Sequence, residues 1–192
     1  MKTITYSITT LKKEDDDLIK QAAHLLYTCF QYNWPEAWPS DEAARVEVET
    51  CVKSKDRFVR IAVNAQGEVL GWIGAISLYD GKVYEIHPLC VRADSRKAGI
   101  GLSLVKDLEV QVYKKGGLTL YLGTDDESEQ TSLSGADLYN DTWDKIKSIK
   151  NLNDHPFSFW EKVGFKIVGV VPDANGRGKP DIMMAKSVEK LR

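Results

Sequence analysis

Residues 83–101, VYEIHPLCVRADSRKAGIG, decide the fold of this chain. Their pattern predicts a strand, a short basic turn and two glycines that open the helical run LSLVKDLEVQVYKK. Glycine lets a backbone approach a ligand closely because it has no Cβ. The first N–H groups of a helix have no intrahelical partner, and the helix dipole favours an anion beside them. Because Arg96 and Lys97 add positive charge, the turn predicts a site for a pyrophosphate.

The two glycines alone leave other interpretations open. No Gly-Lys-Ser/Thr follows them, so the turn is not a P-loop. The dinucleotide fingerprint would require a third glycine where Leu104 stands. The plain structural alternative is a strand-to-helix connection that happens to carry two glycines. The order of strand, Arg-x-x-Gly-x-Gly, amphipathic helix and second strand favours the anion site.

The composition limits the class of protein. With 192 residues, of which 43% are hydrophobic and 28% charged, the chain is expected to form one domain over residues 1–192. A net charge of −2 argues against nucleic acid as a partner and suits a protein that handles cationic small molecules. Neither a secretory segment nor a membrane-spanning run is present, so we expect a cytoplasmic protein without a membrane partner.

The cysteines and the metal-binding residue types carry little signal. The three cysteines have no disulfide-like spacing and are expected to be reduced thiols. Cys90 lies in a predicted strand and is expected to be a core residue rather than a nucleophile. No metal is expected.

Hydrophobic periodicity gives the order of the elements. Strands are predicted at 4–8, 58–63, 69–79, 83–91, 118–122, 165–171 and 181–186, and helices at 18–29, 41–52, 99–115, 136–149 and 155–163. Three consecutive antiparallel strands are followed by a strand–helix–strand unit, which must be a right-handed parallel crossover. The fold class is therefore α/β, in the sense of an α+β mixed sheet. We expect a mostly antiparallel sheet with one parallel βαβ unit and helices on both faces.

The turn resembles the acetyl-CoA-binding loop of the GNAT acyltransferases, through Arg96-x-x-Gly99-x-Gly101 after a strand. Further blocks resemble the aminoglycoside 6'-N-acetyltransferases: EIHPL at 85–89, YLGTDD at 121–126, NLNDHP at 151–156, EKVGF at 161–165 and KPDI at 179–182. They keep their order and spacing from about Trp72 onward, whereas the first third matches loosely, mainly through WPE at 34–36. The resemblance implies the GNAT fold and acetyl transfer from acetyl-CoA to an aminoglycoside 6'-amine, an antibiotic-resistance activity.

The resemblance also implies which residues bind the cofactor. The strand backbone would pair with the pantetheine arm, the N–H of Leu89 would donate to the thioester carbonyl, and the turn would hold the pyrophosphate. The implied set is Leu89, Cys90, Val91, Arg96, Lys97, Ala98, Gly99, Ile100, Gly101 and Trp160. Pro88 has no N–H, so within a strand it predicts a bulge or an unpaired ladder position.

Glu85 is the candidate base for the amine, acting directly or through a water. It alternates in phase with His87 and Leu89, so the three side chains are expected on one side of the strand. A carboxylate beside a sheet can attract a cationic amine or have its pKa raised by desolvation. His87 is the rival base or an orienting residue, and an ordinary surface glutamate is the structural alternative for Glu85.

The expected acid is missing from the sequence. GNAT enzymes commonly place a tyrosine near the cofactor sulfur, and Trp160 stands at that position here. Indole cannot act as a general acid. Protonation by water, unassisted departure of the thiolate and a contribution from Tyr139 stay open, and Trp160 is expected to wall the acetyl pocket.

The substrate is expected to meet acidic and aromatic side chains, namely Trp34, Glu36, Glu85, Asp125 and Asp126. A solvated charged loop is the alternative interpretation of the acidic run after residue 124. Besides an aminoglycoside, the acceptor could be another cationic amine, such as a polyamine or a peptide. A non-catalytic acyl-CoA-binding module is a third hypothesis, which the missing tyrosine keeps open. Apolar residues in the last strands and the habit of the family suggest a homodimer.

Overall fold

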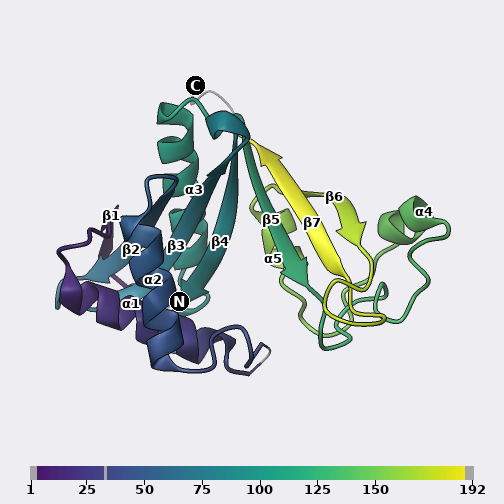
Figure 1. The fold of residues 1–192 in the computed structure, drawn as a ribbon, viewed down its shortest axis with the longest axis horizontal. Helices are drawn as coiled ribbons and strands as arrows, with labels where there is room; N and C mark the ends of the chain where they lie inside the picture. The colour runs from purple at the N-terminus through teal and green to yellow at the C-terminus, as the bar shows by residue number, and fades with distance from the viewer. Residues whose placement is uncertain (1–3, 33, 189–192) are drawn as a thin grey trace. The chain divides into compact units, whose positions relative to one another are not determined.

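The computed structural model describes residues 4–32 and 34–188. It divides into two compact units (Figure 1). Unit 1 runs to Leu118 and includes Val188, and unit 2 is Thr119–Ser187. Each unit has its own antiparallel strand pairing.

The sheet of unit 1 consists of strands that pair in sequence order, each antiparallel to its neighbour: β1 Tyr6–Thr10, β2 Arg57–Asn64, β3 Val69–Leu78 and β4 Val83–Val91. The β2–β3 turn forms because the Asn64 carboxamide oxygen accepts the N–H groups of Gln66 and Glu68. Gly67 supplies the left-handed conformation, with φ +81°. The three consecutive antiparallel strands predicted from the sequence, β2 to β4, are confirmed.

Helices cover both faces of this sheet: α1 Asp16–Phe30, α2 Asp41–Lys53 and α3 Ile100–Lys114, with short 3₁₀ turns η1 Tyr79–Gly81 and η2 Ala93–Ser95. On β3, the Trp72 indole N–H donates to the Ala22 carbonyl of α1 at 3.0 Å. A Cβ added at the preceding Gly71 would lie 3.3 Å from Ile100 and Leu104 of α3. Successive strand residues point to opposite faces, so α1 and α3 lie on opposite sides of β3.

In unit 2, β7 Asp181–Ser187 lies between β5 Thr119–Asp125 and β6 Lys166–Val171 and pairs antiparallel with both. Two short helices complete the unit, α4 Thr142–Lys147 and α5 Phe157–Lys162. Helix α5 packs against β7. The element order β4–α3–β5 that the sequence predicts is present, and the mixed α/β class is confirmed. That the two units form one domain stays a prediction.

The predicted helix over 136–149 is wrong in its extent, because only α4, Thr142–Lys147, is helical. The Asp137 carboxylate accepts the backbone N–H of Tyr139 at 3.1 Å and the side-chain amide of Asn140 at 2.6 Å. Such an aspartate turn competes with the helix because its carboxylate binds backbone N–H groups that the helix would otherwise use. Asp141 then adopts a left-handed conformation with φ 48°, so the helix begins only after it.

Among the helices of residues 4–32 and 34–188, none combines the length and the apolar content that a membrane span requires.

Candidate functional site

Strand β4 carries a bulge at the predicted position. Its register with β3 shifts between Ile73 and Ala75, so that Gly74 opposes both His87 and Pro88. The His87–Pro88 peptide bond is cis. A Cβ at Gly74 would meet the His87 carbonyl oxygen far inside van der Waals contact. The bulge predicted from Pro88 is confirmed, and it depends on a glycine on the neighbouring strand.

The candidate catalytic residues lie along strand β4. Burial alternates along the strand, so that Glu85, His87 and Leu89 are partly exposed while Ile86 and Cys90 are buried. Glu85 and His87 share one side of the strand, as the alternation predicts. Leu89 lies on the other side, because its partner Ile73 has the same orientation as Ala75, the partner of Ile86. The prediction is therefore wrong for Leu89, because the bulge at residues 87 and 88 reverses the alternation. Cys90 is a core residue, 1% exposed.

His87 is held by two residues that the sequence analysis did not assign to the site. Its Nε2 lies 3.8 Å from Oε1 of Glu47 on α2, and its ring lies 5.9 Å from the ring of Trp38. Glu47 is itself fixed by Arg57, whose Nη1 donates to Oε1 at 2.9 Å. Glu47 carries no local motif, because it comes next to His87 only through the packing of α2 on β2.

The loop after α1 extends an aromatic row toward His87. The Trp34 ring lies 5.6 Å from Phe30, and Phe30 meets Trp38 edge-on at 4.7 Å. Trp38 in turn contacts His87, so Trp34 reaches that histidine through two intervening rings. Glu36 is exposed in the same loop. The signal for Trp38 was present in the sequence, as an aromatic residue between two prolines.

The basic turn has the backbone of an anion site. Gly99 caps α3 with φ +85°, and a Cβ there would meet nothing within 4 Å. The glycine is therefore required by conformation rather than by space. Lys97 is also left-handed, with φ 62°. The Ser103 N–H donates to the Gly99 carbonyl at 3.0 Å, so the N–H groups of residues 100–102 precede the first intrahelical bond and are available to a ligand.

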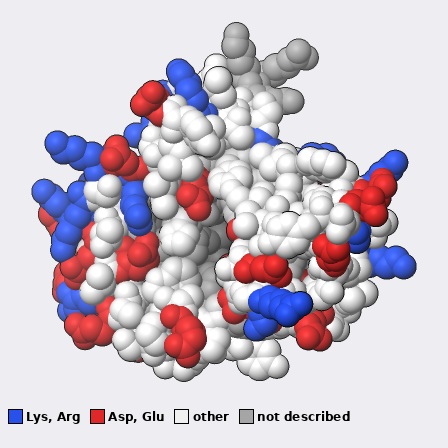
Figure 2. Space-filling view, turned by 45° about the vertical axis from the view of Figure 1, so that its right-hand side comes forward, with Lys and Arg blue, Asp and Glu red and all other residues white. Residues whose placement is uncertain are grey.

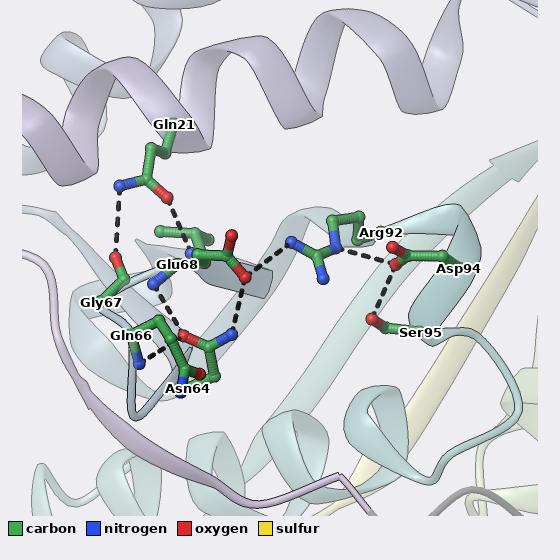
Figure 3. Close-up of polar contacts among 9 residues, drawn as sticks. Gln21, Asn64, Gln66, Gly67, Glu68, Arg92, Asp94 and Ser95 are labelled. Atoms are coloured by element: carbon green, nitrogen blue, oxygen red, sulfur yellow. Dashed lines mark hydrogen bonds and ion pairs between the residues drawn. The ribbon is translucent and has the colours of Figure 1, made fainter.

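A polar network fixes the start of this turn (Figure 3). Arg92 donates to Asp94 at 2.8 Å and to Glu68 of the β2–β3 turn at 3.4 Å. Asp94 also accepts the Ser95 hydroxyl at 2.8 Å. On the other side, Gln21 of α1 donates to a carbonyl of the same hairpin at 3.2 Å. Residues far apart in the sequence thus position the segment that leads into the basic turn.

Arg96 points back toward the sheet and the end of α1. Its Nε donates to the Val91 carbonyl at 3.2 Å, and its Nη2 lies 3.8 Å from Sγ of Cys29. The guanidinium is nevertheless exposed. An exposed guanidinium, Lys97 and unpaired helix N–H groups together fit a pyrophosphate.

In unit 2 the two predicted acidic residues have different environments. Asp126 is 0% exposed, and its carboxylate accepts the N–H of Gln130 at 2.6 Å together with the N–H and hydroxyl of Thr131 at 2.8 and 2.7 Å. Its oxygens therefore hold the loop that follows β5. Asp125 is half-buried and accepts one hydrogen bond, from Asn175 at 2.5 Å.

His155 organises the same end of β5 and was not assigned a role from the sequence. It is 2% exposed, and its Nε2 lies 3.1 Å from the Asp125 carbonyl while Nδ1 accepts the Phe157 N–H at 3.2 Å. This pair of contacts requires the neutral tautomer with its proton on Nε2. Burial lowers the pKa of His155, which favours that neutral form.

Trp160 lies in the core of unit 2. It is 7% exposed and packs at 5.1 Å from the ring of Phe159 and 5.2 Å from that of Phe165. Tyr139, the other open candidate for the acid, is 71% exposed, and its hydroxyl lies 3.3 Å from an Asp173 carboxylate oxygen. The Asp173 charge raises the pKa of Tyr139.

The surface charges are mixed in sign. On the face that Figure 2 shows, acidic and basic side chains are interspersed, and neither sign covers a large area. This pattern agrees with the small net charge of −2.

Comparison with known proteins places the chain in a family. Residues 19–134 match the model of the acetyltransferase (GNAT) family. The chain belongs to this family and is a GNAT acetyltransferase. The cofactor of the family is acetyl-CoA, and the turn from Arg96 to Gly101 fits its pyrophosphate. A comparison with curated protein sequences finds no match.

Solved structures narrow the resemblance. An aminoglycoside 6'-N-acetyltransferase complexed with coenzyme A is 44% identical, with a TM-score of 0.87 and coverage of 97% of this chain and 99% of that one. The aminoglycoside 6'-N-acetyltransferase from Enterococcus faecium is 43% identical, with a TM-score of 0.85 and the same coverage. An aminoglycoside 6'-acetyltransferase type Ii is 34% identical, with a TM-score of 0.72 and again 97% and 99% coverage.

Proposed function

We propose that this protein transfers the acetyl group of acetyl-CoA to the 6'-amine of aminoglycoside antibiotics. The observation that carries the proposal is the position of Glu85 and His87. They share one side of the bulged strand β4, which leads into an anion-binding turn. The aminoglycoside 6'-acetyltransferase activity of the three solved structures named above supports this acceptor over a polyamine or a peptide.

The cofactor would lie along β4 and the basic turn. Arg96, Lys97 and the first N–H groups of α3 would hold the pyrophosphate, and the backbone of Leu89, Cys90 and Val91 would pair with the pantetheine arm. When bound, acetyl-CoA supplies an acetyl group activated as a thioester. The N–H of Leu89 would donate to the carbonyl of that group, as the resemblance implies.

Glu85 would remove the proton of the attacking amine, directly or through a water. It is partly exposed, and within the described residues no hydrogen bond or ion pair engages its carboxylate. His87, held between Glu47 and the Trp38 ring, would orient the amine or relay its proton. These roles are proposed because both side chains lie on the same side of β4 and because carboxylate and imidazole groups can accept a proton from an amine.

The acceptor would be bound by acidic and aromatic groups. In unit 1 these are Glu85, Trp34 and Glu36. In unit 2, Asp125 is half-buried with one partner, and it would accept a cationic or hydroxyl group of the substrate. Asp126 would act on the substrate only by holding the loop, and Trp160 by forming a wall of the acetyl pocket.

We further propose that the enzyme works in the cytoplasm as a homodimer. All three cysteines are free thiols, which suits a reducing compartment. Val168 and Val171 of β6 are 48% and 44% exposed, and a second copy could cover them. Multi-angle light scattering would give twice the chain mass, and a monomer at micromolar concentration would refute the dimer.

The test of the function is a substrate panel combined with Glu85→Gln. Aminoglycosides with a 6'-amine should be acetylated with kcat/KM of at least about 10⁴ M⁻¹s⁻¹, and those without it should not react. Glu85→Gln should lower kcat at least about 100-fold and leave the acetyl-CoA Kd unchanged. The exposed Glu14→Gln serves as the matched control. Turnover of polyamines above that of the drugs would favour the alternative acceptor, and acetyl-CoA binding with no turnover of any amine would favour a non-catalytic module.

A further inference from the structure

Two of the three cysteines meet beside the basic turn. Cys29 lies in the last turn of α1 and is half-buried, whereas Cys90 lies on β4 and is 1% exposed. Cys29 packs against the core cluster that contains Cys90. The thiol of Cys29 also lies 3.4 Å from the Val91 carbonyl oxygen, to which its protonated form donates. The pair therefore joins the end of one helix to the strand that leads into the turn.

The charge next to Cys29 is that of Arg96. Its Nη2 lies 3.8 Å from Sγ, and no other described charged group acts on this thiol to a comparable extent. The neighbouring Cys90 thiol and the Arg96 charge lower the pKa of Cys29 to about 6, against the opposing effect of burial. Burial and the neighbouring Cys29 raise the pKa of Cys90 well above its usual range. One thiol of the pair is thus ionised near neutrality, and its neighbour keeps its proton.

Cys51 provides an internal comparison. It is buried on α2, and its thiol donates to Oε1 of Glu47 at 3.4 Å. Burial raises the pKa of Cys51 to about 11. Like Cys29 it has a cationic neighbour, since Nη1 of Arg57 lies 3.7 Å from its Sγ. It differs from Cys29 in being almost fully buried and in the nearby carboxylate of Glu47.

We propose that Cys29 and Cys90 form a peroxide-sensitive dithiol coupled to occupancy of the Arg96 turn. A hydroperoxide is the oxidant. The Cys29 thiolate attacks its O–O bond, a S–O bond forms, and hydroxide leaves, so the sulfur is oxidised by two electrons and the peroxide is reduced. Cys90 then attacks the sulfenic acid, an S–S bond forms, and the S–O bond breaks with release of water that carries the Cys90 proton.

The coupling rests on the proposed function, because it requires that a pyrophosphate binds Arg96. A bound anion shares the guanidinium charge with Cys29 and disfavours the thiolate. Linkage is reciprocal, so acetyl-CoA should protect Cys29 from oxidation and alkylation, and ionisation of Cys29 should weaken acetyl-CoA binding. Oxidation is therefore directed at the empty enzyme.

The dithiol is tested on the full chain by treating the reduced protein with hydrogen peroxide, blocking free thiols and analysing tryptic peptides by mass spectrometry. A Cys29–Cys90 linked peptide is expected, and it should be lost in Cys29→Ser and kept in Cys51→Ser. In Cys90→Ser, dimedone should trap the sulfenic acid on Cys29. Oxidation of Cys51 in preference to Cys29, or stable Cys29 sulfenic acid in the protein with Cys90 present, would overturn the proposal.

The coupling is tested by the pH profile of alkylation with iodoacetamide. The profile of Cys29 should have its midpoint near 6, and Arg96→Gln should move it upward, while Cys51 stays unreactive in the same range. Saturating acetyl-CoA should move the Cys29 midpoint upward as well. If calorimetry shows acetyl-CoA binding and the midpoint does not move, the coupling is wrong. If acetyl-CoA does not bind at all, the proposed function and the coupling both fail, and the linked peptide still reports on the dithiol.

Discussion

The two units place the residues of the family-like sequence blocks in different environments. In unit 1, Glu85 and His87 stay partly exposed on the face of β4. In unit 2, Asp126, His155 and Trp160 are almost entirely buried and are engaged by their own unit. A sequence block can therefore mark either chemistry or architecture. Burial and hydrogen-bond partners separate the two kinds of residue.

The largest effect is expected at Gly74, where unit 1 shapes its active face. Gly74→Ala would press a Cβ into the His87 carbonyl oxygen at the bulge. Relief requires the strand backbone to move, so we expect a loss of about 3 kcal/mol in the free energy of unfolding, measured in urea. The kcat/KM should fall as well, because the same bulge positions His87 and Leu89.

Gly169→Ala is the matched control for that substitution. Gly169 also lies in a strand beside a register shift, but a Cβ there would meet nothing within 4 Å. Its stability should change by less than about 0.5 kcal/mol. Equal effects of the two variants would contradict the view that the bulge of β4 is sterically matched to Gly74.

The adjacent pair Asp125 and Asp126 tests the comparison inside unit 2. Asp126→Asn would place an amide donor against the donors of Gln130 and Thr131 and should cost about 2 kcal/mol or more of stability. Asp125→Asn keeps an acceptor for Asn175 and should leave stability nearly unchanged. It should instead raise the aminoglycoside KM about tenfold, the equivalent of one charge-assisted contact.

Urea unfolding and steady-state kinetics on both variants separate these outcomes. A large KM effect from Asp126→Asn without loss of stability would show that Asp126 contacts the substrate. A large stability loss from Asp125→Asn would show that both carboxylates are structural and would refute the proposed contact of Asp125 with the substrate.

The sequence predicts best where the information is local. The hairpin turn at Asn64 and the bulge at Pro88 each depend on a few neighbouring residues, and both are confirmed. The alternation along β4 holds from Glu85 to His87, and the bulge then reverses it, so that Leu89 lies on the other face. The helix over 136–149 fails for a reason that is also local, because the turn at Asp137 outweighs the apolar periodicity. Where an aspartate turn interrupts an apolar periodicity, the sequence predicts a helix that begins only after the turn.

Residues that reach the site through packing could not be predicted. Glu47 meets His87 across helix and strand, and Cys29 meets Arg96 across 67 positions of sequence. No local sequence pattern identifies Glu47 or Cys29 as a site residue, because only the tertiary structure brings each of them next to its partner. The resemblance supplied the candidates in unit 2, but only their burial distinguishes Asp126 from Asp125.

A moderate effect is expected at Trp160. Trp160→Phe removes part of a ring packed on Phe165 and should cost about 1–2 kcal/mol of stability by urea unfolding. Trp160→Tyr would place a phenol where the resemblance to the GNAT acyltransferases implies a tyrosine. If this position is architectural in the present chain, kcat of the tyrosine variant should stay within about threefold of the phenylalanine variant. A gain of about tenfold or more for tyrosine would mean that thiolate protonation limits turnover and that position 160 faces the cofactor sulfur.

The smallest effect is a pH dependence that only a buried histidine would give. Burial lowers the pKa of His155 below its ordinary value in the unfolded chain. Between the two pKa values the unfolded state binds more protons, so the stabilising contribution of His155 is complete above about pH 6.5 and declines as the pH falls toward the folded-state pKa. Urea unfolding at pH 7.5, 6.5 and 5.5 should therefore show a steeper loss of stability for the native chain than for His155→Gln, whose side-chain amide can still donate to the Asp125 carbonyl. Parallel slopes would mean that His155 is protonated as readily in the folded protein as in the unfolded chain. In that case the neutral Nε2 tautomer, and with it the architectural role of the histidine at the end of β5, would be wrong.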